Sequence, residues 1–423
     1  MKSRFWLAGV IVVMAAVSGN AQDKPHWLMG RATKLPSEYT NQESGYFSIV
    51  EGLNGRVYIG AAKYGVDAYL LEYDPKTDRT KMAVDAQKII GTNAKGFAAQ
   101  AKFHTRNNVG ASGKIYVGTK QGYPENGESR DLYPGGYAMS YDPATGKAEH
   151  FGIAWPKHGI ISIAPDESRG VAYISTCSDD RPIDHTHFMV LDLKKKTYTD
   201  LGDMEHPYAF IVVDYKGRAY HPIRGGLIAR YDPDRKKLDR LAVSIDGHNP
   251  PREITKDGAI LNWEISPDRK TLWSVEMSTN QLYSFDLTAT GSSIPGKTHG
   301  KLLDWAKQTD CRVMCVGPDG VVWAAVTVHN LPDGPWLHLA NCKPGKPPRD
   351  LGAIGVANPN FTTFTDAAGK PKPWHHTMTR RKDGTLSPWQ PMGICASRDG
   401  SAVYVLTIAP FTLMRFDHKR LDN

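Results

Sequence analysis

The sequence lacks long apolar runs, long blocks of one charge and helical periodicity. After residue 17 no apolar run could cross a membrane, which excludes a multi-pass membrane protein. No Lys/Arg block is longer than Lys194–Lys196, so the charge does not suggest a nucleic-acid-binding arm. No amphipathic helical pattern exceeds a turn or two, which argues against a helical protein. With 40% hydrophobic and 23% charged residues, the chain has the composition of a folded globular protein.

Cysteine is also scarce, and the count is odd. The five cysteines are Cys177, Cys311, Cys315, Cys342 and Cys395. An odd number leaves at least one thiol outside any intrachain disulfide. Most of them lie in apolar, strand-like segments, so we expect buried thiols, although export would allow disulfides. Their spacing matches no zinc-binding pattern.

Residues 1–21 are predicted to be a signal peptide. Lys2 and Arg4 precede an apolar run over residues 5–17, which is shorter than the ~20 residues of a typical membrane span. Gly19-Asn20-Ala21 then offers small residues for cleavage, and an uncleaved anchor is the alternative. We therefore expect a periplasmic or secreted protein, free of the membrane after cleavage. The full chain has a net charge of +8, and without Lys2 and Arg4 of the leader it keeps +6. This mild positive charge favours acidic small molecules or acidic polysaccharides as partners rather than nucleic acid.

An internal repeat organises the rest of the chain. Each copy has an alternating β run with Tyr or Trp at its third or fourth place, followed by a second β run that often ends in Asp-Pro. The first runs begin at Gly55, Gly113, Gly170, Gly217, Lys270, Gly320 and Ser401. Without the leader, the 423 residues give about 57 per copy, enough for four strands of about 5–6 residues with their turns.

Regular four-stranded repeats without helices predict one β-propeller domain over residues 22–423. We expect an all-β fold of seven blades, each of four antiparallel strands, around a central channel. An array of β-sandwiches is the alternative, but its repeats would be nearer ~100 residues. Because the chain stops just after a third-strand pattern at Phe416-Asp417, residues near Trp27–Arg31 are expected to close the ring. We expect a monomer.

Propeller topology indicates which side chains gather at the mouth of the channel. The inner strand of a blade begins there, the second strand ends there, and the third begins there. Polar residues at these positions are, by strand, His104, Arg106, Tyr208, Asn262, Trp263 and Arg312; Lys63, Lys120, His221, Arg224, Glu276 and His329; and Arg130, Tyr133, Asp179, Asp180, Arg181, His185 and His187.

The chemistry of this set points to an acidic sugar. Lys63, Lys120, Arg106, Arg224 and Arg312, with His221, are candidates to bind a carboxylate or sulfate. His104 or His187 is a candidate general base, and Tyr208 a candidate proton donor. A neutralised uronate carboxylate, a base for its C5 proton and a tyrosine acid would together perform β-elimination. A single residue of this kind more often serves a loop or a solvated rim, so the prediction depends on their convergence.

Two further motifs leave alternatives open. His185-Thr186-His187 places two imidazoles on one side of a strand, and Asp180 or Asp184 would complete a metal site. We assign no metal there, and the cofactor requirement stays unknown, with a structural divalent metal as the alternative. Trp374-His375-His376 lies in a long insertion before the last repeat. We expect this insertion to be either a lid that folds over the channel or an ordinary loop.

Two segments resemble a known family. Gln100–Thr105 followed by Gly113–Lys120 is similar to the blade that carries catalytic histidines in the propeller polysaccharide lyases. These are the ulvan lyases and the related L-rhamnose-α-1,4-D-glucuronate lyases and rhamnosidases. Tyr208 and Arg224, 16 residues apart, resemble their tyrosine acid and arginine clamp. The resemblance implies that His104 neutralises or abstracts, that Tyr208 donates or relays a proton, and that Arg224 holds the uronate.

The chain departs from that family at one position. Lys120 stands where a second histidine is expected, so either Lys120 holds the carboxylate or His187 takes the second histidine's role. The leading hypothesis is an exported lyase that cleaves uronate-containing glycan. The alternatives are a glycosidase of the rhamnosidase type and a non-catalytic propeller that binds an acidic sugar or a protein.

Overall fold

The structure is a computed structural model that describes residues 26–41, 44–125, 127–179, 185–206, 208–250, 262–361, 377–408, 410–418 and 421. The predicted leader and the Trp374-His375-His376 motif lie outside these residues, as do Asp180, Arg181 and Asp184. Strands dominate the described chain. Its helices are short: α1 (Ala86–Ile90), and the 3-10 turns η1 (Ser37–Tyr39), η2 (Gly96–Ala98) and η3 (Arg130–Leu132).

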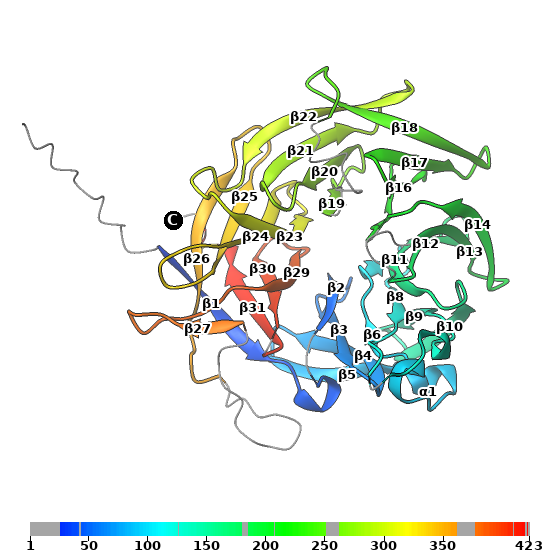
Figure 1. The fold of residues 1–423 in the computed structure, drawn as a ribbon, viewed down its shortest axis with the longest axis horizontal. Coiled ribbons are helices and arrows are strands. Elements are labelled where there is room, and N and C mark those ends of the chain that lie inside the picture. The colour runs from blue at the N-terminus through cyan, green and yellow to red at the C-terminus, as the bar shows by residue number, and fades with distance from the viewer. Residues whose placement is uncertain are drawn as a thin grey trace, which may run out of the picture.

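The strands form consecutive antiparallel groups arranged around a central axis (Figure 1). Blade 1 contains β2 (Ser44–Glu51), β3 (Val57–Lys63), β4 (Asp67–Asp74) and β5 (Arg79–Asp85). Blade 2 contains β6 (Lys102–Phe103), β7 (Asn108–Val109), β8 (Ile115–Lys120), β9 (Tyr137–Asp142) and β10 (Lys147–Ile153). Blade 3 contains β11 (Gly159–Asp166), β12 (Val171–Cys177), β13 (His187–Asp192) and β14 (Thr197–Asp203).

The second half of the chain continues the ring in the same way. Blade 4 contains β15 (Val212–Val213), β16 (Ala219–Ile223), β17 (Leu227–Asp232) and β18 (Lys237–Ile245). Blade 5 contains β19 (Asn262–Ile265), β20 (Thr271–Val275), β21 (Gln281–Asp286) and β22 (Ser293–Lys301). Blade 6 contains β23 (Thr309–Val316), β24 (Val322–Val328), β25 (Trp336–Cys342) and β26 (Arg349–Val356), followed by the small hairpin β27 (Met378–Arg380) and β28 (Leu386–Pro388). Blade 7 contains β29 (Pro391–Ala396), β30 (Ala402–Thr407), β31 (Thr412–Asp417) and, from the other end of the chain, β1 (Trp27–Lys34). The prediction of an all-β propeller is confirmed.

Strand β1 closes the ring, as predicted. Its residues 31–34 pair antiparallel with β31, so the start of the described chain supplies the outer strand of the last blade. Figure 1 shows the blue β1 lying between the red β31 and the orange β26. Residues 27–30 of β1 also pair in parallel with β26 of blade 6. Strands β18 and β22 make a similar parallel pairing between blades 4 and 5, and a β3–β6 bridge joins blades 1 and 2.

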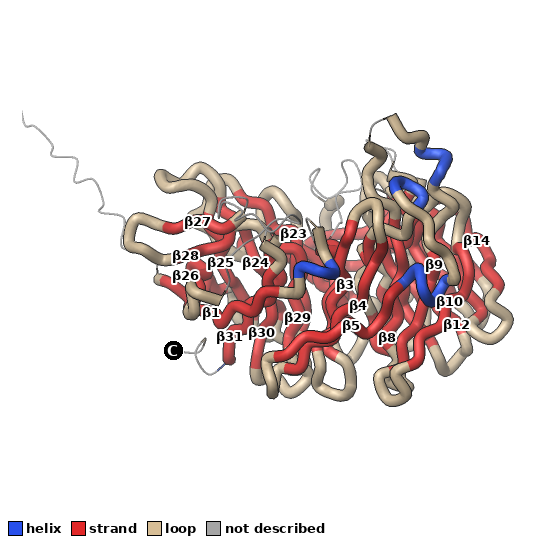
Figure 2. The backbone as a smooth tube through the Cα atoms, turned by 90° about the horizontal axis from the view of Figure 1, so that it is seen from below, coloured by secondary structure: helices blue, strands red, loops and turns tan. Residues whose placement is uncertain are grey.

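The first element of the repeat forms the turn between the inner and second strands. Gly113 has φ 88° and Gly320 has φ 78°, a left-handed conformation that favours glycine. The Gly113 amide donates to the Gly110 carbonyl at 2.9 Å, and the Gly320 amide makes the same bond to Gly317. In blade 5 Arg269 adopts this conformation with φ 56°. Seen from the side, the strands run between two faces of the ring, and loops join them at both faces (Figure 2).

The aromatic residue of the repeat packs neighbouring blades together. Tyr58 on β3 contacts Tyr141 on β9 of the next blade, with ring centroids 5.9 Å apart. Tyr173 on β12 contacts Tyr231 on β17 at 6.2 Å in the same way. A buried tyrosine removes about 150–250 Å² from water, and such ring pairs add about 0.5–1.5 kcal/mol. The Tyr-Asp-Pro ending of the second run therefore serves the contact between blades.

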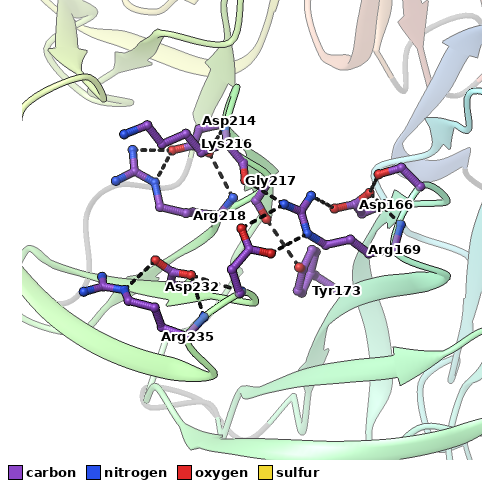
Figure 3. A network of polar contacts seen from close by, with 11 residues as sticks. Asp166, Arg169, Tyr173, Asp214, Lys216, Gly217, Arg218, Asp232 and Arg235 are labelled. Atoms are coloured by element: carbon purple, nitrogen blue, oxygen red, sulfur yellow. Dashed lines mark hydrogen bonds and ion pairs between the residues drawn. The ribbon is translucent and has the colours of Figure 1, made fainter.

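An ionic clamp joins blades 3 and 4 on the face opposite the channel mouth (Figure 3). Arg169 Nη1 donates to Asp166 at 2.9 Å, and its Nε donates to Asp234 at 3.2 Å. Arg169 Nη2 also donates to the Lys216 carbonyl at 3.1 Å. The Arg169 guanidinium thus joins three turns, one from blade 3 and two from blade 4, and holds the two blades together on this face.

The expectation that the cysteines are buried thiols is confirmed for four of them. Cys311, Cys315, Cys342 and Cys395 are buried thiols outside any disulfide, as the apolar context predicted. Burial raises the pKa of Cys315 to about 12, so this thiol stays protonated near neutral pH. In the part of the chain that the structure describes, no helix is long and apolar enough to cross a membrane.

Candidate functional site

The candidate site lies at the channel mouth, where blades 2, 3 and 4 meet. We call it the mouth cluster: His104, Lys120, Asp179 and Tyr208. His104 directly follows β6, and Tyr208 lies shortly before β15, so both are at the starts of inner strands. Lys120 is the last residue of β8, and Asp179 follows the end of β12. These four residues come from three blades and lie at strand starts and strand ends on the mouth side, as the propeller topology predicted.

His104 and Tyr208 are stacked. Their ring centroids are 5.7 Å apart and the ring planes differ by 13°. Phe47 contacts the imidazole of His104 edge-on at 6.0 Å and contacts Phe210 at 4.9 Å. His104 is buried, whereas Tyr208 is half-buried and reaches solvent. Two proton-transfer groups are thus held side by side on a rigid aromatic base.

Lys120 places a positive charge beside this pair. Its Nζ lies 5.2 Å from the centroid of the Tyr208 ring and 3.3 Å from Asp179 Oδ1. It also lies 3.7 Å from Cys177 Sγ. The Lys120 side chain is only 1% exposed, so its charge acts in a region of low dielectric. The ammonium group is therefore able to stabilise negative charge at the mouth cluster.

A second buried lysine extends the positive charge. Lys102 of β6 is 1% exposed and lies directly opposite Lys120 of β8 in the antiparallel register. Side chains at directly opposite positions project to the same side, with Cβ atoms about 4.5–5.5 Å apart. Lys102 Nζ is 4.9 Å from the Tyr64 ring centroid and 4.6 Å from the Tyr123 ring centroid. Lys102 therefore lies beside Lys120 in the sheet, with its ammonium group against a pair of tyrosines.

The tyrosine pair was missed from the sequence. Tyr64 directly follows β3, and Tyr123 lies in the loop after β8, so both satisfy the rule that second strands end at the mouth. Their adjacency to the predicted Lys63 and Lys120 was the available signal. The sequence did not predict that Tyr64 of blade 1 and Tyr123 of blade 2 contact each other.

A buried polar network supports the cluster from behind. Gln100 Oε1 accepts hydrogen bonds from Thr119 Oγ1 at 2.6 Å and from Tyr133 Oη at 3.0 Å. Gln100 Nε2 donates to the Gly135 carbonyl at 3.0 Å. Burial raises the pKa of Tyr133 far above its ordinary value. Tyr133, predicted at the mouth, therefore supports Thr119 and the end of β8 rather than facing a ligand.

Arg106 lies in the channel instead of at its mouth. Its guanidinium donates to the Trp263 carbonyl and to the Glu264 carboxylate, both on β19. It also lies 5.2 Å from the centroid of the Phe210 ring. The surrounding cavity has a volume of about 160 Å³ and includes Glu51 in its lining. Arg106, predicted to bind substrate, thus bridges blades 2 and 5 across the channel.

His221 is enclosed between blades 3 and 4. Its Nε2 is 3.0 Å from Ser175 Oγ, its Nδ1 is 2.6 Å from the Pro222 carbonyl, and its exposed fraction is 0%. Burial lowers the pKa of His221 to about 3, so the ring is neutral near pH 7. Because both ring nitrogens of His221 already have partners within the protein, neither is left for a ligand, in contrast to the predicted role.

His187 is the first residue of β13, the third strand of blade 3. Its ring stacks on Trp155 with centroids 3.8 Å apart, and its Nδ1 is 3.0 Å from Asp200 Oδ2. His185 pairs with Asp203 at 2.5 Å. Among the residues that the structure describes, no three His, Cys, Asp or Glu side chains converge as metal ligands. His187 thus packs on Trp155 and pairs with Asp200, and the proposed metal partners Asp180 and Asp184 lie outside the described chain.

The remaining predicted cations lie on the rim. Lys63 Nζ donates to the Glu38 carbonyl at 2.8 Å. Arg224 Nη1 is 3.6 Å from Glu205 Oε2 and its side chain is 44% exposed. Arg312 Nε donates to Asp310 at 2.7 Å. These exposed pairs leave the guanidinium groups accessible to an anion arriving at the mouth.

Two other predicted residues link neighbouring blades, and a third holds its own loop. Asn262 Nδ2 donates to the Cys311 carbonyl at 2.7 Å, and the Trp263 indole donates to the Phe210 carbonyl at 2.5 Å. Glu276 accepts hydrogen bonds from Ser278 and the Thr279 amide. Asn262 and Trp263 thus join blade 5 to blades 6 and 4, and Glu276 holds the turn after β20; the sequence pattern does not separate these roles from ligand binding.

Comparison with known proteins supports the fold alone. No family model matches the chain, and no curated protein matches it. The extracellular domain of the putative one-component system BT4673 from B. thetaiotaomicron shares 12% identity with a TM-score of 0.49, and the match covers 92% of this chain but 40% of that one. The β-propeller domain of Cps50 (Swd1) from Myceliophteria thermophila shares 10% identity with a TM-score of 0.54 and coverages of 92% and 99%. The WD40 repeats of RRP9 share 8% identity with a TM-score of 0.54 and coverages of 93% and 100%. At such identities the likeness indicates a propeller and no activity.

Proposed function

We propose that this propeller is an exported lyase that cleaves uronate-containing glycan by β-elimination at the mouth cluster. The observation that carries the proposal is the stacked His104–Tyr208 pair with the buried Lys120 ammonium beside it. The resemblance to the propeller polysaccharide lyases, drawn from the same residues, supports the same chemistry. The predicted leader and the net charge of +8 fit an extracytoplasmic protein with an acidic substrate.

In the proposed reaction Lys120 binds the uronate carboxylate. Neutralising that carboxylate makes the C5 proton more acidic, because the negative charge that develops on its removal spreads onto the carboxylate. His104 accepts the C5 proton and Tyr208 donates its phenolic proton to the leaving O4 oxygen. The C5–H and C4–O bonds break and a C4=C5 double bond forms. Each proton transfer then has its own group, and the stack fixes their separation.

The rim cations guide the glycan to the cluster. Arg224 and Arg312 keep exposed guanidinium groups, and Lys63 lies at the end of β3. In this proposal they hold sugars beyond the cleaved linkage, and Arg106 and His221 have structural roles. His187 is not required.

A second candidate is a propeller that binds an acidic sugar without cleaving it. The ion pair between Lys120 and Asp179 favours this alternative, because Asp179 competes with a substrate carboxylate for the ammonium. The lysine that stands in place of a second histidine favours it as well. A hydrolase of the rhamnosidase type would use the same binding surface.

A turnover assay distinguishes these functions. Purified protein is offered a panel of uronate polysaccharides and oligosaccharides, while ultraviolet absorbance and reducing ends are followed together. A lyase raises both, because the unsaturated uronate absorbs; a hydrolase raises reducing ends alone; a binder raises neither. For the lyase, His104→Ala and Tyr208→Phe should each lower kcat by at least about 100-fold. Tyr215→Phe on the opposite face is the matched control. Full activity in both mouth variants would refute the assignment.

A further inference from the structure

Two tyrosines beside the mouth cluster form an aromatic surface, which we call the tyrosine platform: Tyr64 and Tyr123. Their ring centroids are 5.4 Å apart with an interplanar angle of 43°. Tyr123 is 54% exposed, one of the most exposed large apolar side chains in the described chain. A half-exposed tyrosine packed on a second one presents an apolar ring face and a polar hydroxyl to solvent, which suits a sugar ring.

The backbone around Tyr64 holds the platform in place. Asn41 Nδ2 donates to the Tyr64 carbonyl at 3.0 Å, and the Tyr64 amide donates to Asn41 Oδ1 at 2.9 Å. On the other side, a Cβ at Gly122 would lie 3.1 Å from Tyr64 Cδ1 and 3.2 Å from Ala101 Cβ. The absence of a side chain at Gly122 thus lets the Tyr64 ring lie against the loop that carries Tyr123.

Lys102 ties the two rings to the reaction centre. Its ammonium lies over both rings, at 4.9 Å and 4.6 Å, and 3.4 Å from the Tyr64 hydroxyl. Lys102 is also directly opposite Lys120, whose ammonium lies by the Tyr208 ring. The paired strand ends that carry Lys102 and Lys120 therefore connect the tyrosine platform, on one side, with the proposed catalytic pair, on the other.

We propose that the tyrosine platform is a second sugar-binding subsite, so the substrate class is an acidic oligosaccharide chain rather than a single uronate. One sugar ring stacks on Tyr123 while the neighbouring uronate lies at Lys120 and Tyr208. This inference rests on the proposed function for the identity of the second sugar. The stacking of a ring on Tyr123 rests on the platform alone.

Calorimetric binding tests the subsite without turnover. The Tyr208→Phe protein is titrated with uronate oligosaccharides of one, two and four sugars, and with a neutral tetrasaccharide. Tyr123→Ala, added to this background, should weaken tetrasaccharide binding by about tenfold and leave the monosaccharide unchanged, as expected for the loss of one aromatic contact. Tyr123→Phe should restore the affinity, because it keeps the ring. Tyr215→Ala is the matched control, since Tyr215 is also an exposed tyrosine beside lysines but on the opposite face.

The outcomes separate the subsite from the proposed reaction. Equal affinity losses at all lengths, or none at any length, would overturn the subsite even if the protein cleaves uronate. Binding of the neutral tetrasaccharide that depends on Tyr123, without binding of any uronate, would support the subsite and refute the lyase. No binding of either ligand by a folded protein would refute both. Unchanged circular dichroism and unfolding temperature show that the variants are folded.

Discussion

Arg106 provides the sharpest test of which charged residues hold the ring together. Its guanidinium crosses the channel from blade 2 to the Trp263 carbonyl and the Glu264 carboxylate of blade 5. Hydrogen bonds to charged groups contribute about 1.5–3 kcal/mol each, and breaking a buried ion pair costs about 3–5 kcal/mol. The Arg106 and Glu264 side chains are 15% and 23% exposed, so they are only partly buried. We therefore expect a cost at the lower end of the range for a buried ion pair. Arg106→Met should therefore lower the free energy of unfolding by about 3 kcal/mol.

A double-mutant cycle isolates this interaction. Urea unfolding is followed by tryptophan fluorescence for the wild type, Arg106→Met, Glu264→Gln and the double variant. The double variant should be about as unstable as Arg106→Met alone, with a coupling energy of about 2 kcal/mol, because both changes remove the same pair. Additive losses, or a change below about 0.5 kcal/mol for Arg106→Met, would contradict the bridge. Loss of glycan affinity at full stability would instead return Arg106 to the substrate-binding role.

Two further predictions concern pH and ring closure. Burial, with the neighbouring Asp85, raises the pKa of Asp67 to about 8, so ionisation destabilises the fold as pH rises from about 4 to about 8. Asp67→Asn should therefore raise the unfolding temperature more at pH 9 than at pH 5, and an equal effect at both would contradict this. Deleting residues 22–34 removes β1 and should lower the unfolding temperature by at least about 10 °C in calorimetry. Deleting residues 1–21 alone is the control and should change nothing; an unchanged value in the larger deletion would exclude closure by β1.

The fold was predictable because each copy of the repeat contains both the residue needed for a turn between strands and the residue that packs against the next blade. A glycine such as Gly113 marks the turn between strands, and a tyrosine such as Tyr173 marks the contact with the next blade. Because each copy contains both the turn residue and the packing aromatic residue, the strand register and the order of the blades follow from the local sequence. Closure by β1 was predictable for the same reason, since one strand was missing at the end of the chain.

The site was predictable only to the level of strand ends. The topological rule brought His104, Tyr208, Lys120 and Asp179 together correctly. It does not specify which way a side chain leaves its strand, so His221 was assigned to the mouth although it packs between blades. The rule also takes no account of side-chain length. The long Arg106 side chain extends across the channel and pairs with Glu264, which is 158 residues away in the sequence. Such contacts depend on the finished ring and leave no local pattern.

The strand pairing between blades makes the ring unequal around its circumference. Blades 1 and 2, 4 and 5, and 6 and 7 each share a continuous hydrogen-bonded sheet, whereas blade 3 forms a separate four-stranded sheet among the described strands. Continuous strand pairing resists shear between paired blades. The borders of blade 3 rest instead on isolated main-chain bonds, such as that from the Arg106 amide to the Ile161 carbonyl at 2.9 Å, and on side chains such as Arg169. The mouth cluster spans both of these borders, with Lys120 on one side, Asp179 on blade 3 and Tyr208 on the other. The borders with the least strand pairing among the described blades thus run through the proposed reaction centre, where a hinge movement of blade 3 would alter the Lys120–Asp179 separation.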